Sequence, residues 1–302
     1  MKKVLLATSI LAATAGFAAA EVTLSGSARM GVIDDFGADN TGFTSRARVV
    51  FTLSGETDGG LSFGATFRAD NASAANSGDA GEVFMSGAFG KLTMGDIDGA
   101  AQQVVGNVDG VGLTGLDDLN EAVYLGAGTS DGGSNSDPTA AYEYSSGAFT
   151  AIISATNPDN GVLDDPDTVV DESTPDSDSI LALGAKYSTD AFSVGLGYED
   201  ADGIDHIVLG GSASFGAVTV KALFGSASGD VDGDQFALSA AYSADALTVT
   251  AFYADDEELG GVEAYGLGAS YALGGGAKVV GGYSKNDSAD TSAVDLGVSF
   301  SF

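Results

Sequence analysis

The segment Val22-Thr-Leu24-Ser-Gly26-Ser-Ala28-Arg-Met30-Gly-Val32 decides the fold class. Its even positions are apolar or small, whereas its odd positions are mostly polar, so hydrophobicity repeats every two residues. Successive side chains of a β-strand point to opposite faces, so this pattern predicts a strand with one apolar face. Its eleven residues are also the length at which a tilted strand crosses a bilayer. The segment therefore predicts a membrane-spanning strand.

The same alternation recurs along the chain. With 22–32, the alternating segments are 46–54, 61–68, 81–88, 91–96, 139–146, 148–156, 180–188, 191–199, 205–215, 217–225, 234–243, 246–254, 262–272, 276–284 and 293–302. They number sixteen, an even count as single-chain bacterial barrels have. We therefore expect an all-β fold, a transmembrane antiparallel β-barrel of sixteen strands. A soluble β-sandwich with one buried face is the alternative. It is disfavoured because the apolar face carries no Lys or Glu.

The first twenty residues have the pattern of a secretory signal peptide. Lys2 and Lys3 precede an apolar run from Val4 to Ala13, and Ala18-Ala19-Ala20 supplies a small-residue cleavage site. Cleavage between Ala20 and Glu21 would leave a single domain of residues 21–302. A Sec-type signal on a barrel predicts the outer membrane of a Gram-negative cell. Short turns such as Ser146-Gly-Ala-Phe149 would then face the periplasm, and the longer Asp- and Gly-rich loops the exterior.

Composition narrows the functional classes. Residues 21–302 carry nine Lys and Arg against 43 carboxylates, a formal charge of −34, which argues against a nucleic-acid partner. There is no cysteine, so no disulfide stabilises the fold. No stretch of 18 consecutive apolar residues follows the signal region, which excludes a helical membrane protein.

Most of the cations lie on the polar face of the predicted strands, which predicts a water-filled interior. Eight of the nine fall on the polar face of their strands, namely Arg29, Arg46, Arg48, Arg68, Lys91, Lys186, Lys221 and Lys278. If the apolar face meets lipid, these cations line the lumen. Each then avoids the free-energy cost of roughly 2–4 kcal/mol that Arg or Lys carries on the lipid-facing surface at the membrane midplane. The four arginines come from neighbouring strands, so they form one basic patch. A side-chain-filled core would not tolerate so many cations.

A loop of about 43 residues, from Asp96 to Pro138, separates the fifth and sixth strands. Its charged residues are all acidic: Asp96, Asp98, Asp109, Asp117, Asp118, Glu121, Asp131 and Asp137. We expect this loop to fold into the barrel and face the arginines, which would narrow the pore and set up a transverse field. An acidic loop solvated outside the barrel is the alternative.

Several motifs resemble the general diffusion porins of alphaproteobacteria. They are the start Glu21-Val-Thr-Leu-Ser-Gly-Ser-Ala-Arg-Met-Gly-Val32, Ser45-Arg-Ala-Arg-Val49, Phe84-Met-Ser-Gly-Ala-Phe-Gly-Lys91, Leu116-Asp-Asp118 and the ending from Leu273 to Phe302. The resemblance implies a 16-stranded barrel, a homotrimer in outer-membrane lipid and lipopolysaccharide, and a third loop folded inside as the constriction. It also implies calcium held by loop carboxylates in some members, with no cofactor required. The terminal Phe302 resembles the signal that barrel-assembly machinery recognises.

The resemblance also assigns residues to the constriction. By matching motif, Arg29, Arg46, Arg48 and Arg68 form its basic side, and Asp117 and Asp118 its acidic side. Asp109 and Glu121 join the acidic side by loop position only. The expected function is passive passage of ions and small hydrophilic solutes through a water-filled channel.

Other functions remain as alternatives. A substrate-specific porin would need an aromatic slide, but lumen-phase aromatics are few (Phe84 and Phe252). A closed structural or adhesive barrel would carry no current. An enzyme would need a nucleophile near the single histidine, His206, and no motif places one there. Asp-rich stretches such as 230–234 and 255–258 lack a full EF-hand pattern, so they indicate solvated or weakly ion-binding loops.

Overall fold

The structure is a computed structural model that describes residues 21–36, 41–70, 79–126, 139–156, 179–201, 203–256 and 261–302. The predicted signal peptide, most of the predicted loop at 157–179 and the end of the loop at 96–138 lie outside the described residues.

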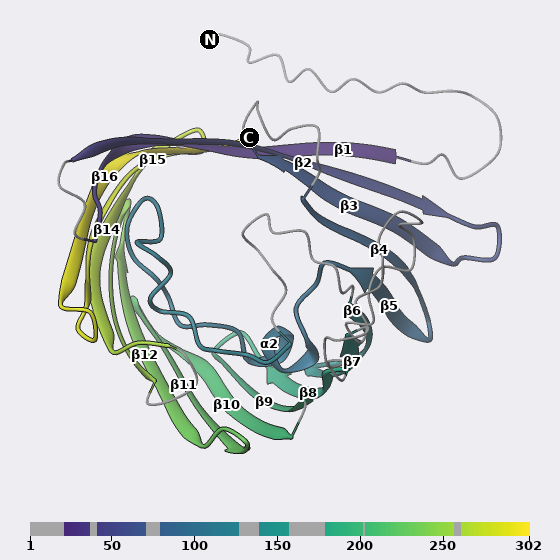
Figure 1. Cartoon of the computed structure of the whole chain (residues 1–302). Helices are drawn as coiled ribbons and strands as arrows, with labels where there is room; N and C mark the ends of the chain where they lie inside the picture. The colour runs from purple at the N-terminus through teal and green to yellow at the C-terminus, as the bar shows by residue number, and fades with distance from the viewer. Residues whose placement is uncertain are drawn as a thin grey trace, which may run out of the picture.

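The described chain forms one closed antiparallel barrel in which each strand pairs with the next and β1 pairs with β16 (Figure 1). The strands are β1 (Glu21–Asp34), β2 (Gly42–Glu56), β3 (Ser62–Asp70), β4 (Asp79–Gly87), β5 (Gly90–Gly95), β6 (Thr139–Ser146), β7 (Phe149–Thr156), β8 (Leu181–Ser188), β9 (Phe192–Ala201), β10 (Ile204–Phe215), β11 (Val218–Gly229), β12 (Gly233–Ala244), β13 (Leu247–Asp256), β14 (Ala264–Gly274), β15 (Ala277–Asn286) and β16 (Thr291–Ser301). Each corresponds to one alternating segment of the sequence. The prediction of sixteen strands is confirmed.

The outer face of the barrel is apolar, as the alternation predicts. Val22 and Leu24 expose 61% and 62% of their surface on β1, and the same phase is exposed on the other strands. A monomeric soluble protein does not present such a continuous apolar surface. Aromatic side chains near the strand ends are exposed on this face, among them Tyr187, Phe192, Phe215, Tyr242 and Tyr271. This arrangement is that of a barrel whose solvent is lipid.

At one end of the barrel, tight turns join neighbouring strands. The hairpins between β6 and β7, β10 and β11, and β12 and β13 contain Gly147, Gly216 and Asp245, with φ of 61°, 64° and 51°. Left-handed backbone of this kind lets two residues reverse a twisted antiparallel pair, and Gly or Asp tolerates it best. The terminal Phe302 lies at this same end, where its amide N–H donates to Gly26 O at 2.9 Å. The closure between the first and last strands therefore extends to the final residue.

The loop after β5 enters the barrel instead of leaving it. It carries the short helix α2 (Ala100–Val105), which packs on β7 to β10 from the inside, and then runs along the inner wall toward β14 and β16 (Figure 1). Apolar loop residues such as Val104, Val108 and Val111 are buried there against wall residues that include Leu223 and Phe252. The core of this protein is therefore the interface between loop and wall, and the predicted inward loop is confirmed. Among the described residues, no helix is long and apolar enough to cross a membrane.

Candidate functional site: a lumen narrowed by an inner loop

Polar side chains of the wall fix the backbone of the loop at separate points. Ser154 Oγ on β7 accepts a hydrogen bond from Ala100 N at 2.8 Å, and Ser239 Oγ on β12 accepts one from Asp109 N at 2.9 Å. On β16, Asp295 Oδ2 accepts from both the amide and the hydroxyl of Thr114, at 2.7 and 2.9 Å. Buried backbone groups need such partners. The loop is thus bonded to the wall across the width of the barrel.

Glycines on the inner face let the loop backbone approach the wall. A Cβ added to Gly197 on β9 would lie 2.7 Å from Ala101 Cα, and one added to Gly282 on β15 would lie 2.7 Å from Gly112 Cα. Both distances are below van der Waals contact, so only glycine fits at these two positions without a shift. Glycine in the lumen phase of a strand is thus a signal in the sequence for the path of the loop, one that the alternation of apolar and polar residues does not reveal.

The tip of the loop has a left-handed backbone over four consecutive residues. Gly115, Leu116, Asp117 and Asp118 have φ of 91°, 51°, 62° and 51°. Such a conformation is unfavourable for non-glycine residues, by about 1–3 kcal/mol each, and persists only where surrounding contacts impose it. Leu116, only 1% exposed, is inserted into the loop–wall core and supplies that contact. The turn leaves Asp117 and Asp118 exposed beside it.

The predicted acidic residues do not lie in one place. Asp117, Asp118 and Glu121 line a pocket of about 220 Å³ together with Asp255 and Asp256 at the end of β13. Asp109 lies apart from them, where its Oδ1 forms an ion pair with Lys221 Nζ on β11 at 2.7 Å. The sequence predicts Asp109 opposite the arginines, whereas the structure pairs it with a lysine of the wall that the loop follows.

The predicted basic residues line the first three strands. Arg29 and Arg46 are directly opposite each other in the β1–β2 register. Arg29 Nη1 also donates to the carbonyls of Leu113 and Thr114, at 3.3 and 3.1 Å. Arg29 therefore contributes positive charge to the barrel wall and also holds the loop tip.

Asp70 partly neutralises this basic wall. Arg48 forms a bidentate pair with it at 2.7–3.0 Å, and Arg68 Nε lies 3.8 Å from Asp70 Oδ2. In the sequence, the alternation of apolar and polar residues ends before Asp70, which predicts that Asp70 lies in a loop. In the structure, the β2–β3 register pairs Asp70 with Arg48, and this pairing identifies Asp70 as a partner of the arginines.

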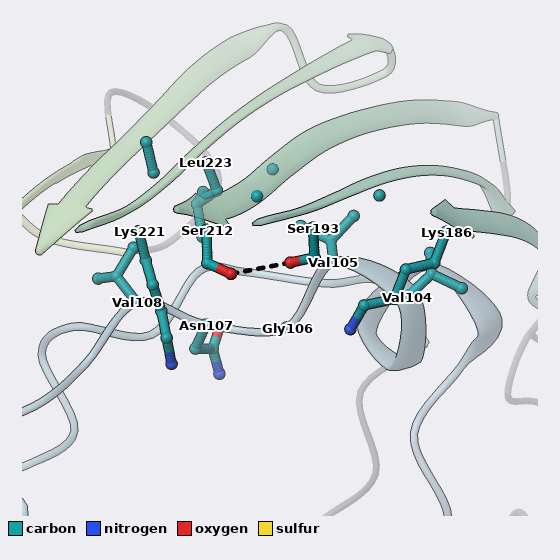
Figure 2. A pocket seen from close by; sticks show the side chains of 14 residues that line it. Val104, Val105, Gly106, Asn107, Val108, Lys186, Ser193, Ser212, Lys221 and Leu223 are labelled. Carbon is teal, nitrogen blue, oxygen red and sulfur yellow. Dashed lines mark hydrogen bonds between the residues drawn. The ribbon is translucent and has the colours of Figure 1, made fainter. Parts of the chain in front are cut away.

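The four lysines are placed on the inner face as well. Lys186 and Lys221 line a pocket of about 420 Å³ beside the loop and extend on either side of Asn107, with a Ser193–Ser212 hydroxyl bond of 2.9 Å behind them (Figure 2). Lys278 lines a second inner pocket of about 310 Å³ with Arg29 and Arg46. Lys91 Nζ lies 4.9 Å from the ring centre of Phe84, a cation–π contact. Lys186, Lys221 and Lys278 therefore line pockets on the inner face of the barrel.

The other candidate sites of the sequence form no catalytic or metal-binding arrangement within the described part of the chain. His206 is buried between Glu199 and Gln235 in contact with the loop, so it is a wall histidine with both ring nitrogens bonded. Among the described residues, no group of three or more His, Cys, Asp or Glu is placed to hold a metal ion. The carboxylates at 257 and 258 lie outside the described residues.

Comparison with known proteins agrees with this geometry. The profile of the family described as "Gram-negative porin" matches residues 7–291. A porin of Rhodobacter capsulatus is 39% identical, and a porin of Fuscovulum blasticum is 29% identical; each alignment covers 93% of this chain and all of the relative. A porin structure refined at 1.8 Å is 36% identical, with a TM-score of 0.77 and coverage of 93% of this chain and all of the other.

Engineered porins also share the fold. A variant of the Rh. blastica porin is 26% identical, with a TM-score of 0.71 over 93% of this chain and all of that one. Fold, inner loop and sequence lead to the same family. The chain belongs to the Gram-negative porins, the non-enzymatic channels of the outer membrane.

Proposed function

We propose that the chain is a general diffusion porin, a homotrimer in which each barrel passes ions and small hydrophilic solutes through a charged constriction. The observation that carries this proposal is the bonded inner loop, which lies along the wall from β7 to β16. The strands that bear Arg46, Arg48 and Arg68 lie across the lumen from most of that path (Figure 1). Arginines on one side and loop carboxylates on the other would orient dipolar solutes and retain water against apolar ones.

The remaining parts of the proposal rest on the sequence. Cleavage after Ala20 would place the mature N-terminus at Glu21, which is where β1 begins. Phe302 would serve as the recognition signal for barrel assembly, and outer-membrane lipid and lipopolysaccharide would surround the trimer. The proposal requires no cofactor. Calcium enters it only as an ion that the loop carboxylates could hold.

Liposome swelling with neutral sugars of increasing size tests general diffusion. We expect the swelling rate to fall smoothly with solute size and to rise in proportion to solute concentration, because no aromatic row lines the described lumen. Phe252 is buried under the loop, and Phe84 is covered by Lys91. Saturation with one sugar that passes much faster than others of its size would favour a substrate-specific porin instead. Liposomes that do not swell would favour a closed barrel.

The titration of Asp117 should appear in the ion selectivity. Partial loss of hydration at the loop tip, together with the nearby carboxylates of Asp35 and Asp118, raises the pKa of Asp117 above the usual value. The repulsion therefore destabilises the loop tip at neutral pH and is relieved as the pH falls through this raised pKa. The excess of carboxylates over Lys and Arg predicts a modest preference of the channel for cations. We expect this preference to begin falling at a higher pH in the native channel than in Asp117→Asn.

Reversal potentials across a KCl gradient, measured at a series of pH values, check this expectation. Asp290→Asn is the matched control. Asp290 lies in an outer turn, and its hydrogen bond with Lys285 lowers its pKa. Loss of its carboxylate should therefore leave unchanged the pH at which the cation preference begins to fall. Identical titration curves for the native channel and Asp117→Asn would contradict the assignment of Asp117 to the lumen.

A further inference from the structure

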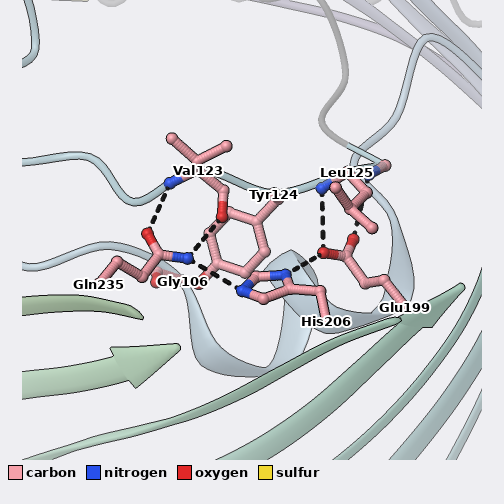
Figure 3. Close-up of polar contacts among 8 residues, drawn as sticks. Gly106, Val123, Tyr124, Leu125, Glu199, His206 and Gln235 are labelled. Carbon is pink, nitrogen blue, oxygen red and sulfur yellow. Dashed lines mark hydrogen bonds and ion pairs between the residues drawn. The ribbon is translucent and has the colours of Figure 1, made fainter. Parts of the chain in front are cut away.

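Three polar side chains of the wall are buried beneath the returning arm of the loop. Glu199 on β9, His206 on β10 and Gln235 on β12 are 0%, 1% and 3% exposed, and loop residues 123–126 cover them (Figure 3). His206 is the only histidine of the chain. Buried polar groups of this kind must satisfy one another's hydrogen bonds, so their bonding pattern can be worked out fully.

The loop backbone fixes the orientation of the Gln235 amide. Its Oε1 accepts from Val123 N at 2.8 Å, and its Nε2 donates to Val123 O at 2.8 Å. The same Nε2 lies 3.0 Å from His206 Nε2. Because the amide nitrogen can only donate, His206 Nε2 must be the acceptor, and the proton of the neutral ring must be on Nδ1.

Glu199 accepts the hydrogen bond that His206 Nδ1–H donates. His206 Nδ1 lies 2.8 Å from Glu199 Oε2. The two carboxylate oxygens also accept from Leu125 N and Gly126 N, at 3.0 and 3.1 Å. The three side chains therefore hold residues 123–126 of the loop through four backbone hydrogen bonds, and the pattern is complete only when the ring of His206 is neutral.

Protonation of His206 is incompatible with this pattern. A proton on Nε2 would face the NH₂ group of Gln235, which places two donors against each other. Rotating the Gln235 amide by half a turn removes the conflict, but it also sets donor against donor and acceptor against acceptor at Val123. Both bonds between Gln235 and Val123 are then lost. Glu199 keeps its bonds to Leu125 and Gly126, so only part of the loop is released.

No other described group next to His206 compensates for this conflict. Strand β11 places Ala227 directly opposite it and Gly225 beside its ring. From the loop comes Tyr124, whose ring packs edge-on at 6.2 Å and whose hydroxyl donates to Gly106 O. Burial, with the charges of Glu199, Asp98 and Glu121, raises the pKa of Tyr124 far above its usual value, so it stays a neutral donor.

The neighbouring acidic pair of the wall is engaged elsewhere. Asp200 and Asp205 are directly opposite each other on β9 and β10, and both accept from the hydroxyl of Tyr198 on the exposed side of the barrel. Neither carboxylate is therefore available to the imidazole ring.

We propose that His206 is a positioning residue of the constriction loop, and that protonation of its ring releases Val123 from Gln235 and loosens the returning arm. Histidine is the side chain that ordinarily changes charge between pH 5 and 8. The part of the arm around Val123 then moves into the lumen and interrupts the current, while Glu199 keeps Leu125 and Gly126 on the wall. This inference rests on the proposed channel function and adds a control of that channel by pH.

Single-channel recording of the full mature protein in planar bilayers, at pH 7.5 and pH 5.0, tests the proposal. For two lost backbone bonds we expect closures to be about tenfold more frequent at pH 5.0. His206→Gln, which keeps a donor for Glu199 but cannot charge, should lose this dependence on pH. Gln235→Met, which lacks the bonds to Val123 at any pH, should close often at both values.

Ser239→Ala is the matched control, because it removes an anchor of the loop at Asp109 that does not titrate. It should close more often than the native channel at both pH values but keep the native ratio between them. The same pH ratio in His206→Gln as in the native channel would overturn the proposal, as would a native channel with no pH dependence. Absence of any current at pH 7.5 would instead contradict the proposed channel function, so the two failures are distinguishable.

Discussion

Deletion of residues 107–125 is expected to raise single-channel conductance by about twofold or more, because the narrowest part of a pore dominates its resistance. The deleted segment contains the residues that line the inside of the wall from β11 to β16, including Asp109, Val111 and Thr114. Helix α2 remains on β7 to β10, so the deletion removes the part of the loop that reaches furthest across the lumen.

The deletion is bounded by Gly106 and Gly126. Gly99 N donates to Gly126 O at 2.7 Å, so the entering and returning arms lie side by side at the start of helix α2, and the new junction has to bring Gly126 along that helix to Gly106. Planar-bilayer recording measures the result. Removal of the same number of residues from the predicted outer loop at 157–179 is the control and should leave conductance nearly unchanged. A 107–125 deletion variant that folds and conducts like the native channel would contradict the role of the loop as the constriction.

Reversal of two cations on the basic wall is the second large effect that we expect. Arg46 and Lys278 line one inner pocket, where the loop tip is held by Arg29 and Asp295 instead. Arg29 is less suitable because it donates to loop carbonyls, and Arg48 because its loss would leave Asp70 without its bidentate partner. Arg46→Glu combined with Lys278→Glu should raise the cation-to-anion permeability ratio several-fold by placing negative charge along the ion path.

Reversal potentials at low and high KCl check this expectation. The effect should be larger at 0.1 M than at 1 M salt, because the Debye length falls from about 10 Å to about 3 Å. Lys285→Glu is the control: its charge pairs with Asp290 at an outer turn, so it alters net charge away from the constriction. A permeability ratio that is unchanged in the double variant, or equally changed in the control, would show that the basic wall does not set selectivity.

The barrel is predictable from the sequence because each strand carries its own evidence. Alternation in a segment such as Val22–Val32 depends only on neighbouring positions, and lipid outside with water inside gives both faces a strong preference. The same alternation also predicts which cations face the lumen, because a charge such as that of Lys186 is far less costly in the lumen than against lipid. The inward path of the acidic loop follows from its length and from the resemblance.

The partners inside the lumen are not predictable in the same way. Asp109 pairs with Lys221 because the loop crosses β11 at that point, and no local pattern of sequence encodes the crossing. Asp70 joins the arginines through the register of β2 with β3, which can shift by two residues without changing which face either strand presents. The bonding of His206 depends on three strands and a returning loop at once. Long-range placement, and not residue type, is the information that local sequence patterns lack.

The central claim is that the barrel encloses an open, water-filled pore despite the loop inside it. Reconstitution of the purified mature chain into planar bilayers tests this claim most directly. We expect stable, ohmic current steps that appear in groups of three equal levels, one for each barrel of a trimer. A protein that inserts into the bilayer as a folded barrel and passes no current would contradict it.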